Sequence, residues 1–257
     1  MSSKLDEKAM TFLADPITKK DAHLNGDFTK VTLKNTPGYS EWKTGQEIYE
    51  KQEEQSLYNS QKFENYLLEI ERDRPVYERF NLSGNILDVG GGAGTIREFI
   101  HQEKCFISVD PFENVENRTP PEKIKAYKCL TQPLNYIEGC AEFLPIKTKS
   151  MDWVHMRSML DHVQIPDLAL IEAHRVLKES GSLLIGLKME TSRYGKESKW
   201  LALRELIKLF VGYTISPKYR DYHTWHPTYK NLIKLVEDNK FKINDIYFQP
   251  GYDGRVV

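Results

Sequence analysis

The sequence predicts a doubly wound α/β domain, in which a mostly parallel sheet carries helices on both faces, preceded by a helical N-terminal extension. Strand-like and helix-like patterns alternate from residue 85 to residue 189, which is the order of repeated βαβ units. The near-continuous apolar content of residues 182–189 is typical of a strand buried on both faces. A glycine cluster directly after the first predicted strand indicates a tight turn into a helix.

The N-terminal part of the chain is predicted to be an arm followed by a helix. Residues 1–45 are polar and broken by proline and glycine, so we expect an irregular arm with little structure of its own. Residues 46–80 are rich in helix formers, and their large apolar side chains recur every three or four residues. Pro75 is expected to kink or restart this helix. The chain is thereby divided into an N-terminal arm and helical lid segment (1–81) and the main domain (82–257).

The main domain begins with the alternating elements. The predicted strands of its sheet are residues 85–90, 105–110, 134–140, 151–157 and 182–189. The predicted helices are residues 95–102, 167–178, 198–212 and 227–239. Gly181 is expected to end the second of these helices. A further strand is predicted at residues 241–248, after a loop rich in tyrosine and histidine.

Composition narrows the classes of partner. The formal net charge is -1 and the isoelectric point is near 6.7, so no nucleic-acid partner is expected. No apolar run approaches the roughly 20 residues of a membrane-spanning helix, and the charged N-terminus does not resemble a secretory signal. The three cysteines are odd in number and show no CxxC spacing, which favours reduced thiols. We therefore expect a cytoplasmic protein that binds no membrane.

The glycine cluster lies in the stretch "NILDVGGGAGT", residues 85–95. A dinucleotide fingerprint needs G-x-G-x-x-G. Counted from Gly90, the second glycine is Gly92, but Thr95 stands in the third position and Gly94 comes one residue early. No Gly-Lys-Ser/Thr follows, so the phosphate-binding loop of nucleoside triphosphatases is absent as well. The spacing weighs against a ligand held by its phosphates.

Two acids indicate the kind of ligand instead. Asp88 stands two residues before Gly90, where a carboxylate would repel a pyrophosphate and would suit a ligand that carries an amine or a sulfonium. Asp110 ends the second predicted strand, 20 residues after Gly90. An acid at this place accepts hydrogen bonds from the two hydroxyls of a ribose. The ligand is expected to be a nucleoside with a positively charged substituent.

The motifs "ILDVGGGAG", "VD", "GCAEFLP", "MDWVHMRSMLDHV" and "EAHRVLKESGSLLIG" follow one another in this order. Together they resemble the class I S-adenosylmethionine-dependent methyltransferases, in particular the broad small-molecule branch called type 11, over residues 82–189. The resemblance implies a seven-stranded, Rossmann-like sheet and S-adenosylmethionine as the cofactor. It also implies transfer of a methyl group to a small-molecule acceptor by in-line displacement.

The resemblance further implies roles for single residues. Gly90, Gly92 and Gly94 would form the loop under the methionine part of the cofactor. Asp88 would act on the cofactor's amino group indirectly. Asp110 would hold the ribose hydroxyls.

Three further residues complete this set. Ala141 and Glu142 would lie beside the adenine, and Arg157 would contact the cofactor mainly through its backbone.

The sequence departs from the family pattern in two places. Members of the family commonly continue after the ribose-binding acid with a helix, whereas residues 111–123 hold three prolines and show no helical period. The family usually ends in an antiparallel hairpin, of which residues 241–257 supply one strand and the beginning of its partner.

Histidines are the candidates for the chemistry of the acceptor. A general base is needed only when the acceptor is a hydroxyl or another weak acid, and histidine is the commonest choice. His162 comes just after the fourth predicted strand, and His223 and His226 lie in the loop "YRDYHTWHPTY" (219–229). We expect them to act as base or to orient the acceptor. Alternatively, His162 caps the following segment and the other two form a structural pair. No motif such as H-E-x-x-H is present, so no metal is predicted.

The N-terminal arm carries aromatic residues that could close over the cofactor. Tyr39, Trp42, Tyr49 and Tyr58 are the candidates for such a lid, which would keep water from the reaction. The alternative is ordinary packing of a helix on the sheet.

Two other functions compete with the methyltransferase. One is an NAD(P)-dependent enzyme that acts on a nucleotide sugar, and the other is a non-catalytic scaffold that binds the cofactor. The loop rich in tyrosine, histidine and tryptophan favours a polar acceptor, such as a sugar or another polar metabolite. The acceptor atom stays open, as does the oligomeric state.

Overall fold

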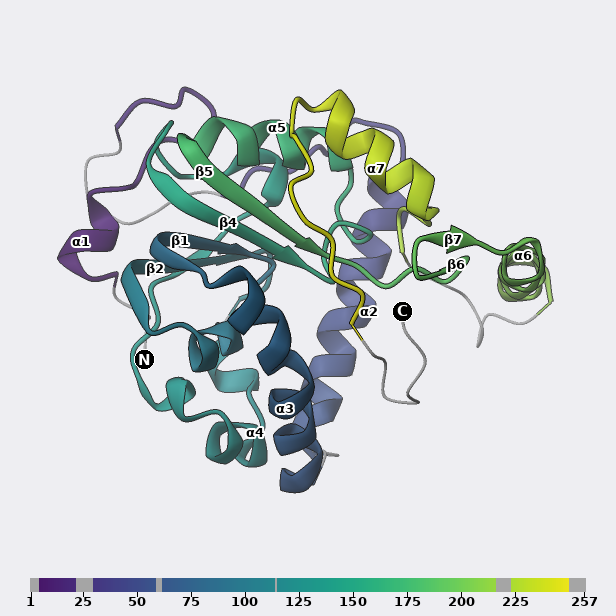
Figure 1. Cartoon of the computed structure of the whole chain (residues 1–257), viewed down its shortest axis with the longest axis horizontal. Coiled ribbons are helices and arrows are strands. Elements are labelled where there is room, and N and C mark those ends of the chain that lie inside the picture. Colours follow the sequence, from purple (N-terminus) through teal and green to yellow (C-terminus); the bar gives the residue numbers. More distant parts are fainter. Residues whose placement is uncertain (1–4, 22–29, 59–61, 114, 216–222, 250–257) are drawn as a thin grey trace.

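The computed structural model describes residues 5–21, 30–58, 62–113, 115–215 and 223–249. Its centre is a five-stranded parallel sheet in the order β3-β2-β1-β4-β5 (Figure 1). The strands are β1 (Ser83–Val89), β2 (Gln102–Asp110), β3 (Tyr136–Glu138), β4 (Met151–Arg157) and β5 (Leu177–Gly186). The prediction of a doubly wound, parallel α/β sheet is confirmed.

The strand order reverses beside β1. The chain runs from β1 outward through β2 to β3 and then crosses back to β4 on the other side of β1. Because all five strands are parallel, their carboxyl ends lie at one edge of the sheet. In the register, Asp88 of β1 lies between Ser108 of β2 and His155 of β4. Ligands of doubly wound folds bind outside the carboxyl ends of the strands at such a reversal.

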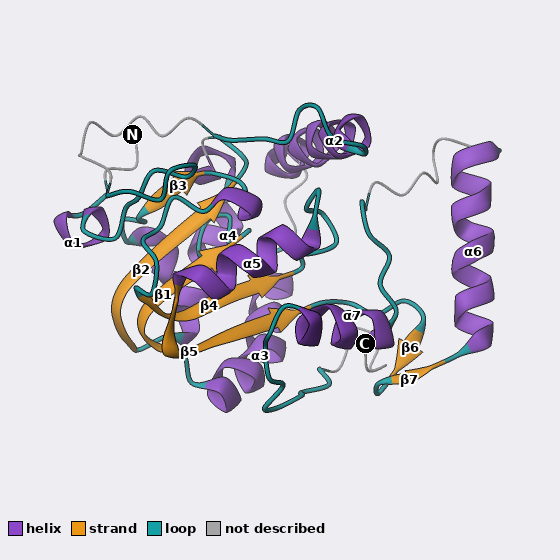
Figure 2. Cartoon of the chain, turned by 90° about the horizontal axis from the view of Figure 1, so that it is seen from above, coloured by secondary structure: helices purple, strands orange, loops and turns teal. Residues whose placement is uncertain are grey.

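Helices cover both faces of the sheet (Figures 1 and 2). On one face lies α5 (Pro166–Val176), which packs on Leu87, Ile107 and Val154. On the other face lies α3 (Phe63–Phe80), whose Tyr77 shares a buried cluster with Ile86 of β1. Neighbouring residues of β1 thus point to opposite cores, as the two-residue period of a strand requires.

The remaining helices and strands lie before β1, between β2 and β3, and after β5. They are α1 (Glu7–Met10), α2 (Tyr39–Tyr58), α4 (Pro121–Ala126), β6 (Ser192–Arg193), β7 (Lys196–Glu197), α6 (Lys199–Thr214) and α7 (Tyr229–Asp238). Four short 3₁₀ turns are η1 (Thr95–Phe99), η2 (Val115–Arg118), η3 (Lys128–Thr131) and η4 (Ala141–Phe143). The helix α6 stands apart from the sheet in both views (Figures 1 and 2) and exposes Trp200, Leu206 and Phe210. Within the described ranges, no helix is both long and apolar enough to cross a bilayer.

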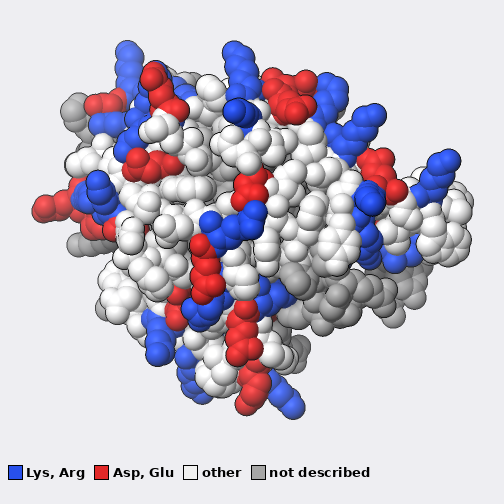
Figure 3. All heavy atoms as spheres, in the orientation of Figure 1, with Lys and Arg blue, Asp and Glu red and all other residues white. Residues whose placement is uncertain are grey.

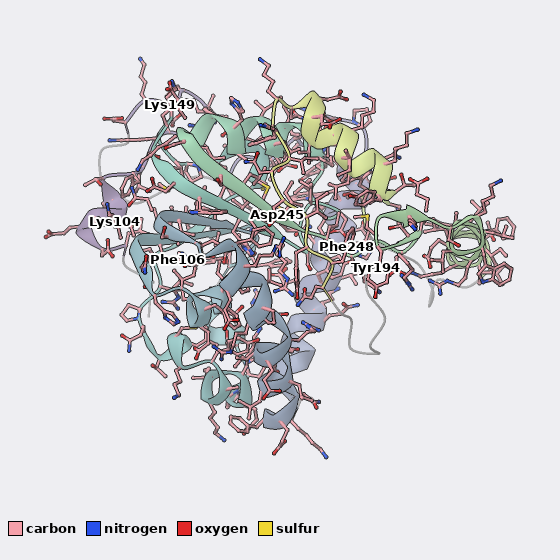
Figure 4. The ribbon with its side chains drawn as sticks, in the orientation of Figure 1. Lys104, Phe106, Lys149, Tyr194, Asp245 and Phe248 are labelled. Carbon is pink, nitrogen blue, oxygen red and sulfur yellow. The ribbon has the colours of Figure 1, made fainter. Side chains whose placement is uncertain are left out.

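Within the described residues the main sheet has five strands, not the predicted seven. Residues 241–248, predicted as a strand, form no ladder with β5. An extended segment becomes a strand only when its backbone groups pair with a neighbouring strand, and the expected hairpin partner falls in residues 250–257, outside the described residues. Side chains hold the segment instead: Arg79 donates two hydrogen bonds of 2.8 Å to Asp245. The ring of Phe248 lies 5.9 Å from that of Tyr194 (Figure 4).

Three predicted helices also differ from the structure. The helix predicted at 167–178 ends at Val176, because Leu177 is extended and pairs with Met151 at the start of β5; Gly181 therefore lies inside a strand. The helix predicted at 95–102 is the short turn η1, since β2 already begins at Gln102. The single helix predicted over 46–80 is two helices, α2 and α3, and Pro75 lies inside α3 without restarting it.

Candidate functional site

A cavity of about 470 Å³ opens at the carboxyl edge of the sheet, beside the reversal of strand order. This volume lies within the range of about 300–1,000 Å³ that is usual for small-molecule sites. Its wall is formed by the loop after β1, the end of β2, the turn η4, the residues after β4 and the helix α2. The cavity therefore collects most of the segments that the sequence singled out.

The loop after β1 needs its glycines for two different reasons. Gly92 has a φ of 50°, a left-handed conformation that residues with a Cβ rarely adopt, and Gly90 and Gly94 share this property with φ values of 70°. Gly91 has no such φ, but a Cβ at this position would lie 2.2 Å from Oδ2 of Asp88. The loop therefore lies so close to the sheet that no side chain fits beneath it.

Asp88 lies beneath this loop and not in the cavity wall. The residue is 1% exposed, and its Oδ1 lies 2.7 Å from Nδ1 of His155. Nε2 of His155 lies 3.2 Å from the hydroxyl of Tyr77, whose pKa burial raises above its ordinary range. The Oδ2 atom of Asp88 is buried and finds no hydrogen-bond partner within the described part of the chain. A buried carboxylate thus puts negative charge directly under the loop.

Asp110 lies in the cavity wall at the end of β2 and is 5% exposed. Its Oδ2 accepts a hydrogen bond of 3.0 Å from the backbone N–H of Gly92, and its Oδ1 accepts one of 3.2 Å from that of Phe112. The two backbone donors fix the carboxylate in one orientation. Asp110 therefore ties the glycine loop to the sheet and presents a preoriented acceptor to the cavity.

Ala141 and Glu142 belong to η4 and also line the cavity. Glu142 is buried, and its Oε1 accepts hydrogen bonds from the backbone N–H groups of Gln164 (2.8 Å) and Ile165 (3.2 Å), just before α5 begins. Burial raises the pKa of Glu142 above its ordinary value, although these hydrogen bonds oppose the change. The sequence did not reveal this anchoring of the α5 entry, because its partners are more than 20 positions away along the chain.

Arg157 directs its side chain away from the cavity. It donates hydrogen bonds of 2.7 and 2.8 Å to the two oxygens of Asp73 in α3 and one of 3.2 Å to the hydroxyl of Tyr77. Burial alone would raise the pKa of Asp73, but the hydrogen bonds and charge of Arg157 hold it below its ordinary value. The next two residues, Ser158 and Met159, line the cavity.

Among the predicted cofactor residues, Gly94 also lies outside the cavity wall. A Cβ added to Gly94 would meet the side chains of Leu134 and Arg97.

The histidines fall into two groups. His162 lines the cavity, and its ring centroid lies 4.4 Å from that of His223. Asp161 joins them: its Oδ1 lies 3.8 Å from Nε2 of His162, and its Oδ2 lies 3.5 Å from Nε2 of His223. His226 is exposed, with its ring centroid 5.9 Å from that of His223. The structure thus brings Asp161, His162 and His223 together and leaves His226 exposed beside His223.

Part of the predicted aromatic lid reaches the cavity. Trp42 and Tyr49 of α2 line it, and the ring of Tyr49 meets the ring of His162 edge-on at 4.6 Å. Tyr39 packs on Trp42 with a centroid distance of 5.8 Å. The side chain of Tyr58 lies outside the described residues.

The sequence did not single out the lining residues that follow β2, among them Phe112, Val115, Arg118 and Lys123. The three prolines of residues 111–123 could have indicated these lining residues, since prolines predict a loop, and a loop at this place can fold back over the site. Arg118 joins this segment to α2 through an ion pair of 2.7 Å with Glu50. The loop after β2 and the N-terminal helix are therefore held together beside the cavity.

Residues 87–185 match the family profile described as "Methyltransferase domain". This segment is a methyltransferase domain. It begins at Leu87 in β1 and ends in β5, so it contains the glycine loop, the end of β2 and the segment after β4. Its cofactor is S-adenosylmethionine. No curated protein matches the chain.

Solved structures with the same fold include two bacterial proteins. A candidate methyltransferase from Bacillus halodurans is 21% identical, with a TM-score of 0.51 over 67% of this chain and 70% of its own. The YcgJ protein of Bacillus subtilis is 19% identical, with a TM-score of 0.51 over 69% of this chain and 71% of its own. At this level of identity the likeness establishes the fold of the methyltransferase domain and nothing finer.

The residues around the cavity fit S-adenosylmethionine. Gly90, Gly91 and Gly92 line the cavity without side chains, which allows close approach of a ligand to the backbone. The oriented carboxylate of Asp110 matches hydroxyl donors, and the buried charge of Asp88 favours a cationic group over a pyrophosphate. The site is therefore chemically suited to the cofactor that the family uses.

Proposed function

We propose that the methyltransferase domain transfers a methyl group to a small polar acceptor, such as a sugar or another polar metabolite. The observation that carries this proposal is the polar part of the cavity wall after β4. His162 lines the cavity there, Asp161 and His223 lie against it, and Tyr49 of α2 packs on its ring. An acceptor with hydroxyl or amine groups finds hydrogen-bond partners at this wall, whereas a long apolar chain does not.

The cofactor would occupy the part of the cavity next to β1 and β2. Gly90 and Gly92 would lie under its methionine part, with Gly94 shaping the loop, and Asp110 would accept hydrogen bonds from the ribose hydroxyls. This arrangement is supported by the oriented carboxylate of Asp110 and by the buried charge of Asp88 beneath the loop.

The adenine would lie beside Ala141 and Glu142 of η4. Arg157 would then act through the position of the backbone that follows it, since its side chain is bound to Asp73. When bound, S-adenosylmethionine supplies an electrophilic methyl group on sulfur. The role of the protein is to hold an acceptor atom in line with that group.

The acceptor would be held by the histidines. His162 would orient it from the cavity wall, with His223 and the exposed His226 in the adjoining loop. Trp42 and Tyr49 cover the cavity from α2 and would exclude water, which would otherwise compete for the methyl group. In-line displacement in such a site depends mainly on positioning.

The competing functions have less support. A nicotinamide dinucleotide needs room for a pyrophosphate, and the G-x-G-x-G spacing and Asp88 disfavour it. A non-catalytic scaffold does not need a polar wall beyond the cofactor. Acidic and basic side chains alternate over the face drawn in Figure 3 without a large basic patch, which agrees with a small-molecule acceptor rather than a nucleic acid. We further propose a cytoplasmic location, since the three cysteines are free thiols.

The proposal is tested by incubating the protein with S-adenosylmethionine that carries a deuterated methyl group and with pooled polar metabolites. Mass spectrometry should find the label in a small polar molecule. The Asp110→Ala variant, which keeps the polar wall, should transfer far less label. Label found only in protein, nucleic acid or long-chain lipid would contradict the small polar acceptor. No label transfer from a cofactor that binds would favour the scaffold.

A further inference from the structure

The cluster of Asp161, His162 and His223 has the composition of a metal site. Imidazole nitrogens and a carboxylate oxygen are the ligands that divalent transition-metal ions take in proteins. One ligand atom from each residue can be chosen so that all three lie within 4.8 Å of one another. No local sequence pattern indicates this set, because His223 lies in a loop far along the chain from Asp161 and His162.

The separations agree with coordination. A metal such as zinc binds histidine nitrogen and carboxylate oxygen at about 2.0–2.2 Å, so two ligand atoms in a tetrahedral arrangement lie about 3.4 Å apart. Two different oxygens of Asp161 make the short contacts: Oδ2 lies 3.5 Å from Nε2 of His223, and Oδ1 lies 3.8 Å from Nε2 of His162. One ligand atom from each residue lies within 4.8 Å of the others, so the side chains must turn toward a shared ion. Small rotations of the side chains would close this difference. The Oδ1 atom of Asp161 is buried and has no hydrogen bond to any described residue.

The backbone holds the three residues in place independently of any ion. The N–H groups of Thr224 and Trp225 donate hydrogen bonds of 2.9 and 3.3 Å to the carbonyl oxygen of Asp161. The loop that carries His223 is thereby fixed to the segment after β4. The N–H of His162 donates to the carbonyl of Met159 at 2.9 Å, which fixes the backbone at the second histidine. A site whose ligands are already positioned loses little entropy when it binds an ion.

The position of the cluster connects it to the acceptor. Asp161, His162 and His223 are all half-buried, and His162 lines the cavity. Three protein ligands leave at least one coordination position open, as in catalytic metal sites. That position would face the part of the cavity proposed for the acceptor. A cation there would bind an acceptor oxygen and lower the pKa of its hydroxyl.

We propose that Asp161, His162 and His223 bind a divalent transition-metal ion, which orients a hydroxyl-bearing acceptor in the cavity. This inference deepens the proposed function and rests on it for the role of the ion, but not for its binding. Acceptors with two neighbouring oxygens, such as vicinal diols of sugars, suit the site best, because both oxygens can coordinate one cation.

Metal binding is tested on the full chain after dialysis against a chelator. Co²⁺ serves as the probe, since its visible absorption reports its ligands, and Zn²⁺ uptake is measured by mass spectrometry of the metal. We expect one ion per chain. His223→Ala and Asp161→Asn should each weaken binding by at least about tenfold. His226→Ala is the matched control, because it removes a neighbouring histidine outside the cluster, and it should bind like the wild type.

Three results would overturn the inference: no uptake by folded wild-type protein, equal uptake by His223→Ala, or a loss in His226→Ala as large as in His223→Ala. Circular dichroism establishes that each variant is folded. Binding of S-adenosylhomocysteine is measured on the same metal-free protein and is expected to be unchanged. If that molecule binds while the metal does not, the metal site is refuted and the methyltransferase function stands. If the metal binds without S-adenosylhomocysteine, the proposed function is the part that fails.

Discussion

Gly91 is the residue of the glycine loop whose replacement tests the packing of the site most sharply. In Gly91→Ala the new methyl carbon would lie 2.2 Å from Oδ2 and 2.3 Å from Cγ of Asp88, and 2.8 Å from Oγ of Ser108. Asp88 is 1% exposed and Ser108 is fully buried, so neither side chain has space to retreat. The loop itself must therefore move away from the sheet.

The size of the effect follows from the kind of strain. Overfilling a packed interior destabilises a protein by about 1–3 kcal/mol. For a chain of this size that corresponds to a fall of about 2–12 °C in melting temperature. Because the displaced loop also lines the cavity, the affinity for S-adenosylhomocysteine should fall as well.

Gly92→Ala provides the comparison. Its Cβ would meet only Val115, at 3.9 Å, so this substitution is strained by its φ of 50° and not by a clash. A left-handed residue with a Cβ costs about 1–2 kcal/mol. The two variants thus lose similar stability for different reasons, and a second substitution separates them.

The assay is a double-mutant cycle with Asp88→Ala, measured by chemical denaturation. Removing the carboxylate opens space under Gly91, so Gly91→Ala should cost clearly less in the Asp88→Ala background than in the wild type. The cost of Gly92→Ala should be the same in both backgrounds. If Gly91→Ala proves neutral, or its cost does not depend on Asp88, then the loop does not pack tightly on the Asp88 side chain.

Two further predictions concern buried acids. Arg157→Met should destabilise the protein by about 1–3 kcal/mol, because it removes two hydrogen bonds to the buried Asp73, which keeps Arg72 and Gln249 as partners. Arg157 holds the pKa of Asp73 below 3.8, so the wild type should lose this contribution as the pH falls below about 4. The melting temperatures of the wild type and the variant should therefore converge in acid. A difference that stays constant with pH would contradict this prediction. Glu142→Gln keeps an acceptor for the N–H groups of Gln164 and Ile165 and removes a charge whose burial raises the pKa. Wild-type stability should fall as the pH rises above 4.5, because the folded protein holds the Glu142 proton more tightly than the unfolded chain. The variant should therefore melt at a higher temperature than the wild type at pH 7 and not at pH 4. A lower melting temperature of the variant at pH 7 would speak against a raised pKa of Glu142.

The sheet was largely predictable because its strands carry strong local signals. The strand predicted at 151–157 has the observed bounds, and the glycine loop lies where its spacing placed it. The lack of strand pairing at 241–248 was not predictable, because strand formation depends on a partner rather than on the apolar content of the segment itself. The early end of α5 has a similar cause, since pairing of Leu177 with Met151 outweighs helical periodicity.

The site was predictable where one segment carries its residues, and less so where distant segments meet. Asp110 and Ala141 were found from motifs, and both line the cavity. The pairing of Arg157 with Asp73 joins β4 to α3, and no local sequence pattern predicts this pairing. The meeting of Asp161 with His223 likewise depends on how the C-terminal loop folds back. Such contacts become visible only when the chain is folded.

We propose that the cavity binds S-adenosylmethionine with Asp110 at its ribose. Titration calorimetry with S-adenosylhomocysteine measures this binding, with NAD as the competing ligand. We predict that wild-type protein binds one S-adenosylhomocysteine per chain and shows no binding of NAD. Asp110→Ala should weaken the binding by about 1–3 kcal/mol, the usual contribution of hydrogen bonds to a charged group. Folded wild-type protein that binds NAD and not S-adenosylhomocysteine would contradict the account.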